Sequence, residues 1–565
     1  MKKRVVVIGG VACGPKAASR IKRLMPHAEV TIIEKNEILS YAGCGLPYYI
    51  AGEVRDHSEL MSTPAGVVRD THFFRAVKDI TVVNRTVAER IDRKTKEVHA
   101  VSTLTGERRV FPYDELVLAV GSRTIQPPIP GVELKGVNFL STVEDARKIR
   151  DQEGSLEGKH AVIIGAGLIG VEVTEAFVRQ GMKVRIVEQT EHLLENLVDP
   201  EIAFHLKNEM LQKGVALNLK DRAKEILGDD QGRVRTVVTE QGSYPADMVL
   251  IAVGVRPEIR LAEEAGLEIG PLGGIRVDSH MRTSDPSIYA GGDCVENTSR
   301  VTGKPVYAPM GSTANKHGRV IADNICGRPT RFPGVLGTAI VRIFDLSLAR
   351  TGLTEKETGQ EELSVVTALS PAPDRAHFLP SAKVIIIKLI AENPSGRIVG
   401  CQVVGYGDVA KRIEVAVTSM SHGGTVMDLG NYDLAYAPPF SPAMDNIIVA
   451  ANIAENKIND IGHGITPSEV RTRMEEGDDF IFLDVRSPEE FEQIRIEDER
   501  VRLVPLGKLR EQIETIPKDK EIITFCKISL RGYEAQRILD GAGYAKVRYM
   551  DGGVVAWPYK KFVAS

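Results

Sequence analysis

The chain has 565 residues, of which 43% are hydrophobic and 26% are charged, and its formal net charge is −4. This length predicts about three or four domains, and the ordinary composition is typical of soluble globular proteins. The slightly negative charge argues against a general electrostatic drive toward nucleic acid, and no apolar run reaches the ~18 residues of a membrane-spanning helix.

A first nucleotide-binding site is predicted at the N-terminus. An apolar run, residues 5–8, leads into a glycine turn and a helix, and the next apolar run ends at Glu34. Gly9 permits the tight turn and Gly14 permits close packing of the helix on the strand, while the helix N-terminus offers free N–H groups to a pyrophosphate. Glu34 would bind a ribose hydroxyl. Val11 replaces the usual second glycine, which weakens the fingerprint.

A second, complete fingerprint follows in VIIGAGLIGVEV, through Gly165, Gly167 and Gly170. The strand after its helix ends at Glu188. An acidic residue at this position accepts the 2′-hydroxyl of NAD and repels the 2′-phosphate of NADP. The chain is therefore predicted to bind two dinucleotides, with NADH preferred over NADPH.

Together with three further segments, these motifs resemble the flavoprotein disulfide reductases with two dinucleotide-binding domains, over residues 1 to about 450. The segment TSDPSIYAGGDC resembles the family's second FAD motif, and the resemblance implies that Asp293 binds the ribityl chain. Segments around Gly121 and before Pro257 resemble the two crossings between the FAD and NAD domains. Glu172 occupies the family position near the nicotinamide.

A single cysteine, Cys44, lies in SYAGCGLPYY, and no second cysteine precedes Cys294 to form a local disulfide with it. This context resembles coenzyme A disulfide reductases and, more loosely, NADH oxidases and peroxidases. The resemblance implies that electrons pass from NADH through FAD to Cys44, which alternates between a thiolate and a mixed disulfide with coenzyme A. It also implies that Arg20, Arg23 and Ser40 bind coenzyme A; for the arginines, a solvated helix face is the alternative.

Two departures from the coenzyme A pattern concern the general acid. Gly43 stands where an asparagine usually precedes the cysteine, and AHFLP, residues 376–380, replaces a tyrosine-containing segment. A second tyrosine is retained as Tyr436, in a segment that in the family reaches the flavin site of the partner subunit. The identity of the general acid is therefore open.

The alternation of strands and helices predicts an α/β chain with two Rossmann-like domains, each built on a parallel sheet with right-handed crossovers. The third domain is expected to be α+β, with a mixed sheet backed by helices, and by resemblance it forms a homodimer. The expected domains are an FAD domain at 1–110 and 260–325, an NAD domain at 111–259, a dimerisation domain at 330–450 and a further α/β domain at 465–565.

Residues 465–565 resemble a rhodanese domain. Cys526 follows the apolar strand IITF, and the next residues lead into a helix. Backbone N–H groups, the positive end of that helix and Arg531 would stabilise a thiolate or persulfide. Ser529 replaces the glycine of the family's loop, and a serine resists the backbone geometry that glycine accepts. An active sulfurtransferase is the preferred interpretation, and a degenerate domain that docks a sulfur carrier is the alternative.

The remaining cysteines are expected to be core residues, because cysteine is among the most buried residue types; they are Cys13, Cys294, Cys326 and Cys401. The six cysteines form no zinc-type pair, so no metal site is expected. Free thiols suit a reducing compartment, which predicts a cytoplasmic protein. The basic start before an apolar run resembles a signal peptide only superficially, because the run leads directly into the nucleotide turn.

The function predicted from these features is an FAD-dependent NADH oxidoreductase that reduces coenzyme A persulfide or disulfide, or polysulfide, through Cys44. The rhodanese domain would supply sulfane sulfur, which favours persulfides over plain coenzyme A disulfide. One alternative is an NADH oxidase or peroxidase that cycles through a cysteine sulfenic acid. The other is a redox-sensing or sulfur-carrier scaffold, for which a sulfur-carrier protein would be a partner.

Overall fold

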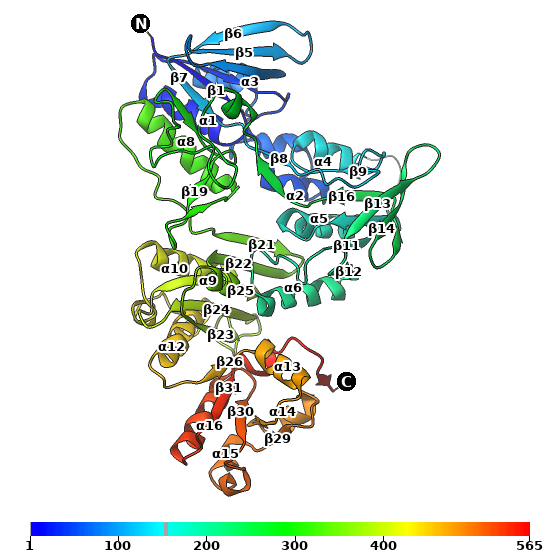
Figure 1. Ribbon diagram of the computed structural model, residues 1–565, viewed down its shortest axis with the longest axis vertical. Helices are drawn as coiled ribbons and strands as arrows, with labels where there is room; N and C mark the ends of the chain where they lie inside the picture. Colours follow the sequence, from blue (N-terminus) through cyan, green and yellow to red (C-terminus); the bar gives the residue numbers. More distant parts are fainter. Residues whose placement is uncertain (1, 152–155, 565) are drawn as a thin grey trace. The chain divides into compact units, whose positions relative to one another are not determined.

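The computed structural model describes residues 2–151 and 156–564. The chain divides into two compact units (Figure 1): the first contains Met1–Thr190 and Gly214–Val335, and the second contains Glu191–Lys213 and Leu336–Ser565. Each unit is described by itself. Among the described residues, no helix combines the length and the apolar character that crossing a membrane requires.

The first unit begins with a five-stranded parallel sheet in the order β18-β7-β1-β2-β3. Helices α1 (Cys13–Leu24) and α8 (Gly311–Ile325) pack against each other beside it. The strands are β1 (Arg4–Ile8), β2 (Glu29–Ile33), β3 (Thr81–Val83), β7 (Glu115–Leu118) and β18 (Ile288–Ala290). Because β7 pairs with both β1 and β18, the boundary expected at residues 110 and 111 is wrong, and the FAD domain extends through β7.

A second parallel sheet in this unit has the order β12-β11-β10-β16-β9 and repeats the strand–helix–strand pattern of the first. Helices α4 (Val143–Arg150) and α5 (Leu168–Arg179) belong to this domain. The strands are β9 (Val137–Asn138), β10 (His160–Ile164), β11 (Lys183–Val187), β12 (Ala216–Asn218) and β16 (Met248–Ile251).

Smaller antiparallel elements complete the first unit. The two predicted crossings form a ribbon in which β8 (Ser122–Thr124) pairs with β17 (Val255–Pro257). Two three-stranded sheets extend the domains: β4 (Thr86–Asp92), β5 (Glu97–Ser102) and β6 (Arg108–Pro112) in one, and β13 (Ala223–Gly228), β14 (Val234–Thr239) and β15 (Ser243–Pro245) in the other.

The second unit contains a five-stranded sheet in the order β21-β22-β25-β24-β23. Every pairing in it is antiparallel, so the expectation of a mixed sheet is wrong. Its strands and the helices of this region are β21 (Ala339–Ile343), β22 (Leu346–Gly352), β23 (Val365–Pro373), β24 (Val384–Glu392), β25 (Ile398–Gly405), α9 (Glu355–Gln360), α10 (Val409–Ser421), α11 (Val426–Gly430) and α12 (Asn446–Ile458).

Helix α6 (Pro200–Gln212) belongs to this second unit, although its sequence lies within the expected NAD domain at 111–259. Lys388 of β24 is 1% exposed, and its Nζ lies 3.1 Å from Asp199, 3.0 Å from Glu201 and 2.7 Å from Glu355. A lysine this deeply buried needs charged partners. Two of these partners come from the start of α6, which attaches the helix to the antiparallel sheet and corrects the expected domain boundary.

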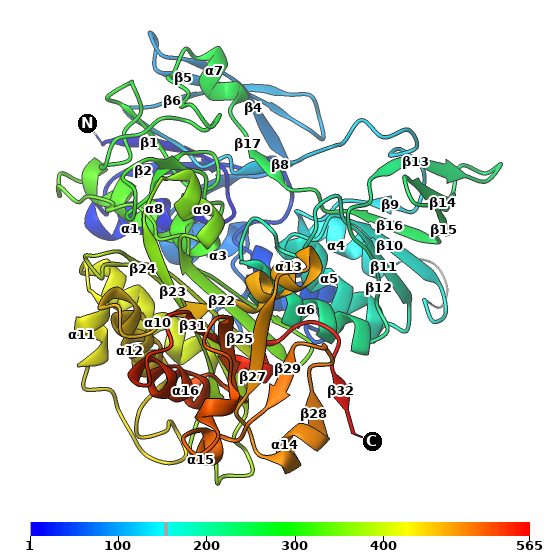
Figure 2. The same ribbon diagram turned by 60° about the horizontal axis from the view of Figure 1, so that its bottom comes forward.

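The C-terminal part of the second unit has a parallel sheet in the order β26-β31-β30-β27-β29. Figure 2 shows β27, β29 and β31 of this sheet. Thr466 and Glu469 form a capping box at its first helix. The elements are β26 (Gly464–Ile465), α13 (Pro467–Glu476), β27 (Phe480–Asp484), α14 (Pro488–Gln493), β29 (Val501–Leu503), α15 (Leu506–Leu509), β30 (Glu521–Phe525), α16 (Leu530–Gly541), β31 (Val547–Met550) and α17 (Gly553–Ala556).

Candidate functional site: two nucleotide turns and two cysteine loops

The two nucleotide turns have the same backbone geometry. Gly9 and Gly165 have φ values of 108° and 103°, in the region that favours glycine. A Cβ added to Gly14 would lie 1.9 Å from the carbonyl oxygen of Gly9, and one added to Gly170 would lie 2.2 Å from that of Gly165. Each helix therefore approaches its turn as closely as the fingerprint predicts. Gly167 differs from these glycines, because a Cβ added there would meet nothing within 4 Å.

Each turn is also tied to the acidic residue that ends the next strand. Glu34 Oε2 accepts the Gly10 N–H at 2.7 Å, and Glu188 Oε2 accepts the Ala166 N–H at 2.7 Å. Burial raises the pKa of Glu34, and N–H donation from Asn36 and Gly10 opposes that shift. A carboxylate oxygen accepts more than one hydrogen bond, so both acids fit the ribose hydroxyls of two dinucleotides.

Asp293 fits the second FAD motif. It is half-buried, and the hydroxyl of Ser122 donates to its Oδ2 at a long 3.4 Å. Burial raises the pKa of this carboxyl. At nearby Gly121, whose φ is 73°, an added Cβ would meet nothing within 4 Å. An acceptor with one long hydrogen bond beside open space suits a ribityl hydroxyl.

Cys44 lies in a short 3-10 helix, Gly43–Gly45, directly before α2 (Leu46–Ile50). The residue is exposed, but its surroundings partly desolvate the thiol and so raise its pKa, and the carboxylates of Glu172 and Asp293 act in the same direction. The structure thus places Cys44 where the charges of two other predicted site residues, Glu172 and Asp293, act on its thiol. Burial also raises the pKa of Glu172, to about 7.

Ser40 positions the Cys44 loop on the first nucleotide turn. Its N–H donates to the carbonyl oxygen of Gly10 at 2.7 Å. Its φ of 53° is unusual for a residue other than glycine, and the residue is buried. Backbone contact of this kind supports the loop, and the proposed contact of Ser40 with coenzyme A stays a prediction.

The two predicted coenzyme A arginines differ in their surroundings. The guanidinium of Arg20 pairs with Asp323 of α8 at 2.6 Å, and the two side chains are 13% and 4% exposed. Arg23 is exposed at the end of α1. The structure therefore leaves Arg23 available to a phosphate, whereas Arg20 is already neutralised by a buried partner.

In the second unit, Cys526 follows β30 and is completely buried. Arg531 interacts electrostatically with Cys526 and donates from both terminal nitrogens to the Glu490 carboxylate, at 2.6 and 2.7 Å. This pairing holds the pKa of Glu490 at about 2. Glu490 was not singled out from the sequence, although it lies in the segment FLDVRSPEEFE. No local signal indicates that it pairs with an arginine 41 residues later.

The loop keeps a glycine-like geometry at Ser529, although a serine resists that geometry. Ser529 has a φ of 98°, the left-handed geometry that glycine favours, and is 3% exposed. Its Oγ accepts the N–H of Gly552 at 2.6 Å. That hydrogen bond holds a backbone conformation that a serine rarely adopts, so the loop keeps its form without glycine.

Other predicted residues are placed as follows. Tyr436 is exposed in the segment between α11 and α12 of the second unit. Cys13, Cys294 and Cys401 are buried, as expected, whereas Cys326 is only half-buried, at the end of α8.

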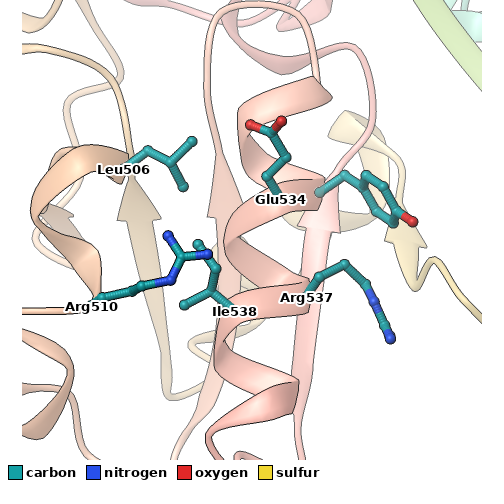
Figure 3. Close-up of a pocket in the computed structure, with 6 residues that line it drawn as sticks. Leu506, Arg510, Glu534, Arg537 and Ile538 are labelled. Atoms are coloured by element: carbon teal, nitrogen blue, oxygen red, sulfur yellow. The ribbon is translucent and has the colours of Figure 1, made fainter.

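A pocket of about 460 Å³ lies between α15 and α16 (Figure 3). In Figure 3, Arg510 lies beside Ile538, whereas Arg537 points away from them. Arg537 donates to the carbonyl oxygen of Ile461 at 3.2 Å. Because Cys526 does not line this pocket, the pocket itself identifies no catalytic site.

Comparison with protein families decides the classification. The pyridine nucleotide-disulphide oxidoreductase family matches residues 3–312. The dimerisation domain of that family matches 338–448, and the rhodanese-like domain matches 466–559. The chain belongs to the pyridine nucleotide-disulphide oxidoreductases. Both predicted resemblances are confirmed, and the chain is an oxidoreductase whose cofactors are FAD and a pyridine nucleotide.

Three individual relatives match this chain over nearly their whole length. A "NAD-Dependent Persulfide Reductase from A. fulgidus" is 45% identical, with a TM-score of 0.93, and the match covers 98% of this chain and 100% of that one. The NAD(P)H coenzyme A polysulfide/persulfide reductase of Pyrococcus horikoshii is 38% identical, over 80% of this chain and 98% of the relative. An NADH oxidase of Methanocaldococcus jannaschii is 33% identical, over 81% of this chain and 99% of the relative.

Glu188 predicts a preference for NADH of at least about tenfold in kcat/KM, because its charge repels a 2′-phosphate. The guanidinium of Arg185 donates to Asn218 and lies 4.1 Å from the ring centroid of Tyr244, so these contacts hold it in place and we expect it not to bind the 2′-phosphate. Glu188→Gln keeps a hydrogen-bond acceptor and should reduce the preference several-fold, whereas Gln189→Ala should not. Steady-state kinetics with both nucleotides check this, and equal kcat/KM values for the parent enzyme would refute the assignment.

Proposed function

We propose that this protein uses NADH to reduce coenzyme A persulfide or polysulfide through Cys44. Two cysteines carry this proposal. Cys44 is exposed and single, and the charge of Asp293 in the FAD motif acts on it. The second cysteine, Cys526, is buried in a rhodanese loop. Simple exchange between thiols and disulfides needs no domain that carries sulfane sulfur. Two relatives are named as persulfide or polysulfide reductases, which supports the same substrate class.

The chemistry assigned to Cys44 is nucleophilic. Its thiolate attacks the inner sulfur of coenzyme A persulfide, the S–S bond breaks, and hydrosulfide leaves with the electron pair. The product is a disulfide between Cys44 and coenzyme A. When bound, FAD transfers the two electrons of NADH to sulfur. With those electrons the disulfide opens, so that the Cys44 thiolate and the coenzyme A thiol are restored.

We further propose that the protein works as a homodimer. Four large apolar side chains of the dimerisation domain are 52–69% exposed; they are Phe378, Tyr436, Phe440 and Met444. Two of the segments that carry them are joined by a hydrogen bond from Ala376 N–H to the carbonyl oxygen of Pro438. Exposed apolar clusters mark interaction surfaces, and the family match indicates a second copy of this chain. Tyr436 then approaches the partner's Cys44 site as the candidate general acid.

The rhodanese domain is proposed to supply the sulfur. The nearby Arg531 and the retained loop geometry around Cys526 favour an active sulfurtransferase over a degenerate domain. A sulfur-carrier protein is a further partner in this proposal. Six free cysteines suit a reducing compartment, and we therefore place the protein in the cytoplasm.

One observation favours a second candidate function. Cys44 is exposed, and exposed thiolates are the ones that peroxide oxidises to sulfenic acid. The similarity to an NADH oxidase is consistent with this chemistry. Anaerobic NADH oxidation with coenzyme A persulfide, coenzyme A disulfide, polysulfide or peroxide separates the two functions, and a clear preference for peroxide would favour the oxidase class.

Replacement of Cys44 by serine should abolish reduction of every sulfur acceptor while FAD stays bound, because a hydroxyl cannot form the covalent sulfur intermediate. We expect a rate loss of at least about a thousandfold, the scale on which an essential nucleophile contributes. Stopped-flow NADH oxidation and the flavin absorbance measure the two properties. Cys401→Ser, at a buried site in the second unit, is the control. A substantial residual rate would indicate direct transfer to the substrate.

The basic residues of α1 give a prediction on substrate affinity. Arg23→Ala should raise KM for coenzyme A persulfide about fivefold, and more at low ionic strength, as expected for one exposed phosphate contact. Arg20→Ala should also lower the melting temperature, because it leaves Asp323 buried and unpaired. Polysulfide has no phosphates and serves as the control. Equal effects on polysulfide and coenzyme A persulfide would assign these residues to a solvated helix face.

A sulfur relay predicts an asymmetric effect of Cys526→Ser. Turnover with thiosulfate or polysulfide as the sulfur donor should fall, whereas turnover with preformed coenzyme A persulfide should not. Covalent fusion favours such a relay, because tethering gives an effective concentration of about 1 mM when the linker spans the sites. Steady-state rates with each donor measure the difference. Equal rates for the variant and the parent with all donors would exclude the relay.

A further inference from the structure

The loop that carries Cys526 is held by the turn that follows the neighbouring strand. Strands β30 and β31 are adjacent and parallel, so the Cys526 loop and the turn after β31 leave the same edge of the sheet. The Gly552 N–H donates to Ser529 Oγ at 2.6 Å, and the Val554 N–H donates to the Cys526 carbonyl at 2.9 Å. A Cβ on Gly553 would lie 2.3 Å from that carbonyl oxygen. Any shift of the turn therefore moves the loop.

Residues outside the rhodanese domain hold the turn after β31 in place. Asp551, the first residue of the turn, is 1% exposed and forms an ion pair with Lys457 of α12. Lys457 also donates to the carbonyl oxygen of Thr367 in β23 at 2.7 Å. On the same strand, Leu369 lies 3.1 Å from where a Cβ of Gly552 would be. Figure 1 shows β23 beside the rhodanese sheet.

Inside the rhodanese domain the turn is held by a backbone hydrogen bond from the Asp551 N–H to the carbonyl oxygen of Ile465 at 2.9 Å, whereas the partner for the Asp551 charge comes from α12. The turn contains a buried carboxylate, whose burial raises its pKa, and the ammonium of Lys457 compensates its charge. A buried charge without a partner is strongly unfavourable, so Asp551 and its turn are fixed where α12 presents the lysine. A continuous path of contacts then connects Lys457 to the nucleophile, through Asp551, Gly552 and Ser529.

We propose that Lys457 is a positioning residue for sulfur transfer at Cys526, acting through the Asp551 turn. The inference rests on the proposed function in one respect, that Cys526 accepts sulfane sulfur. In the step concerned, Cys526 Sγ attacks the outer sulfur of thiosulfate. A Sγ–S bond forms, the S–S bond of thiosulfate breaks, and sulfite leaves with the electron pair. Lys457 contacts none of the reacting atoms and controls where Sγ lies.

The test compares the full chain with Lys457→Met, with Lys457→Arg, and with Lys457→Met combined with Asp551→Asn. The combined variant leaves no unpaired buried charge and keeps the test valid if Lys457→Met fails to fold. Transfer of sulfur from thiosulfate to cyanide gives kcat and KM, and mass spectrometry measures the sulfur added to Cys526. NADH-dependent reduction of coenzyme A disulfide through Cys44 reports on the integrity of the other site.

For the methionine variants we expect kcat of sulfur transfer to fall at least about tenfold, with little change in KM for thiosulfate, because misplacement of a nucleophile lowers the rate. Lys457→Arg should restore most of the rate, and reduction at Cys44 should not change. Unchanged kcat in the combined variant, or an equal loss at both sites, would overturn the inference. Absence of sulfur on Cys526 in the parent would instead refute the sulfurtransferase function, and the positioning role with it.

Discussion

Both nucleotide sites depend on one interaction, the hydrogen bond from a turn N–H to the carboxylate that ends the next strand. Glu34 and Glu188 each accept such a bond at 2.7 Å. The same turns are also bound to the neighbouring strand, because Gly9 N–H donates to Ile33 and Gly165 N–H donates to Val187, both at 2.9 Å. The acid therefore fixes the turn before any ligand binds and faces the place where a ribose belongs.

The first nucleotide turn also holds the loop of the redox cysteine, through a backbone hydrogen bond. Ser40 donates to Gly10, the residue that also donates to Glu34. The Cys44 loop is thus attached to the turn that would hold the FAD pyrophosphate, and its cysteine interacts electrostatically with Asp293. Because these connections are made by the backbone, they do not depend on the side chain at position 43, where glycine replaces the usual asparagine.

In the second unit, buried lysines hold neighbouring segments together. Lys388 joins α6 to the antiparallel sheet through three carboxylates, and Lys457 joins that sheet and α12 to the rhodanese turn. Such pairs are poor sources of net stability but are costly to break, because one charge then remains buried. These buried ion pairs favour one arrangement of the segments that they join. A fixed arrangement suits the rhodanese domain, because the position of its buried cysteine must match the substrate.

The sequence by itself determined the family, the cofactors and the candidate nucleophiles. The glycine turns, the acidic residues that end the following strands and the Cys44 segment are local patterns. Each depends on a few consecutive residues, so each can be recognised in the sequence before the fold is known. The tertiary structure decided which charges are already paired. It showed Arg20 held by Asp323, Arg531 held by Glu490 and α6 attached to the second unit. It also showed that Ser529 keeps a glycine geometry, since Gly552 donates to its hydroxyl across 23 residues. Each of these outcomes depends on partners distant in the chain, and no local pattern encodes which distant partner a buried polar group will find.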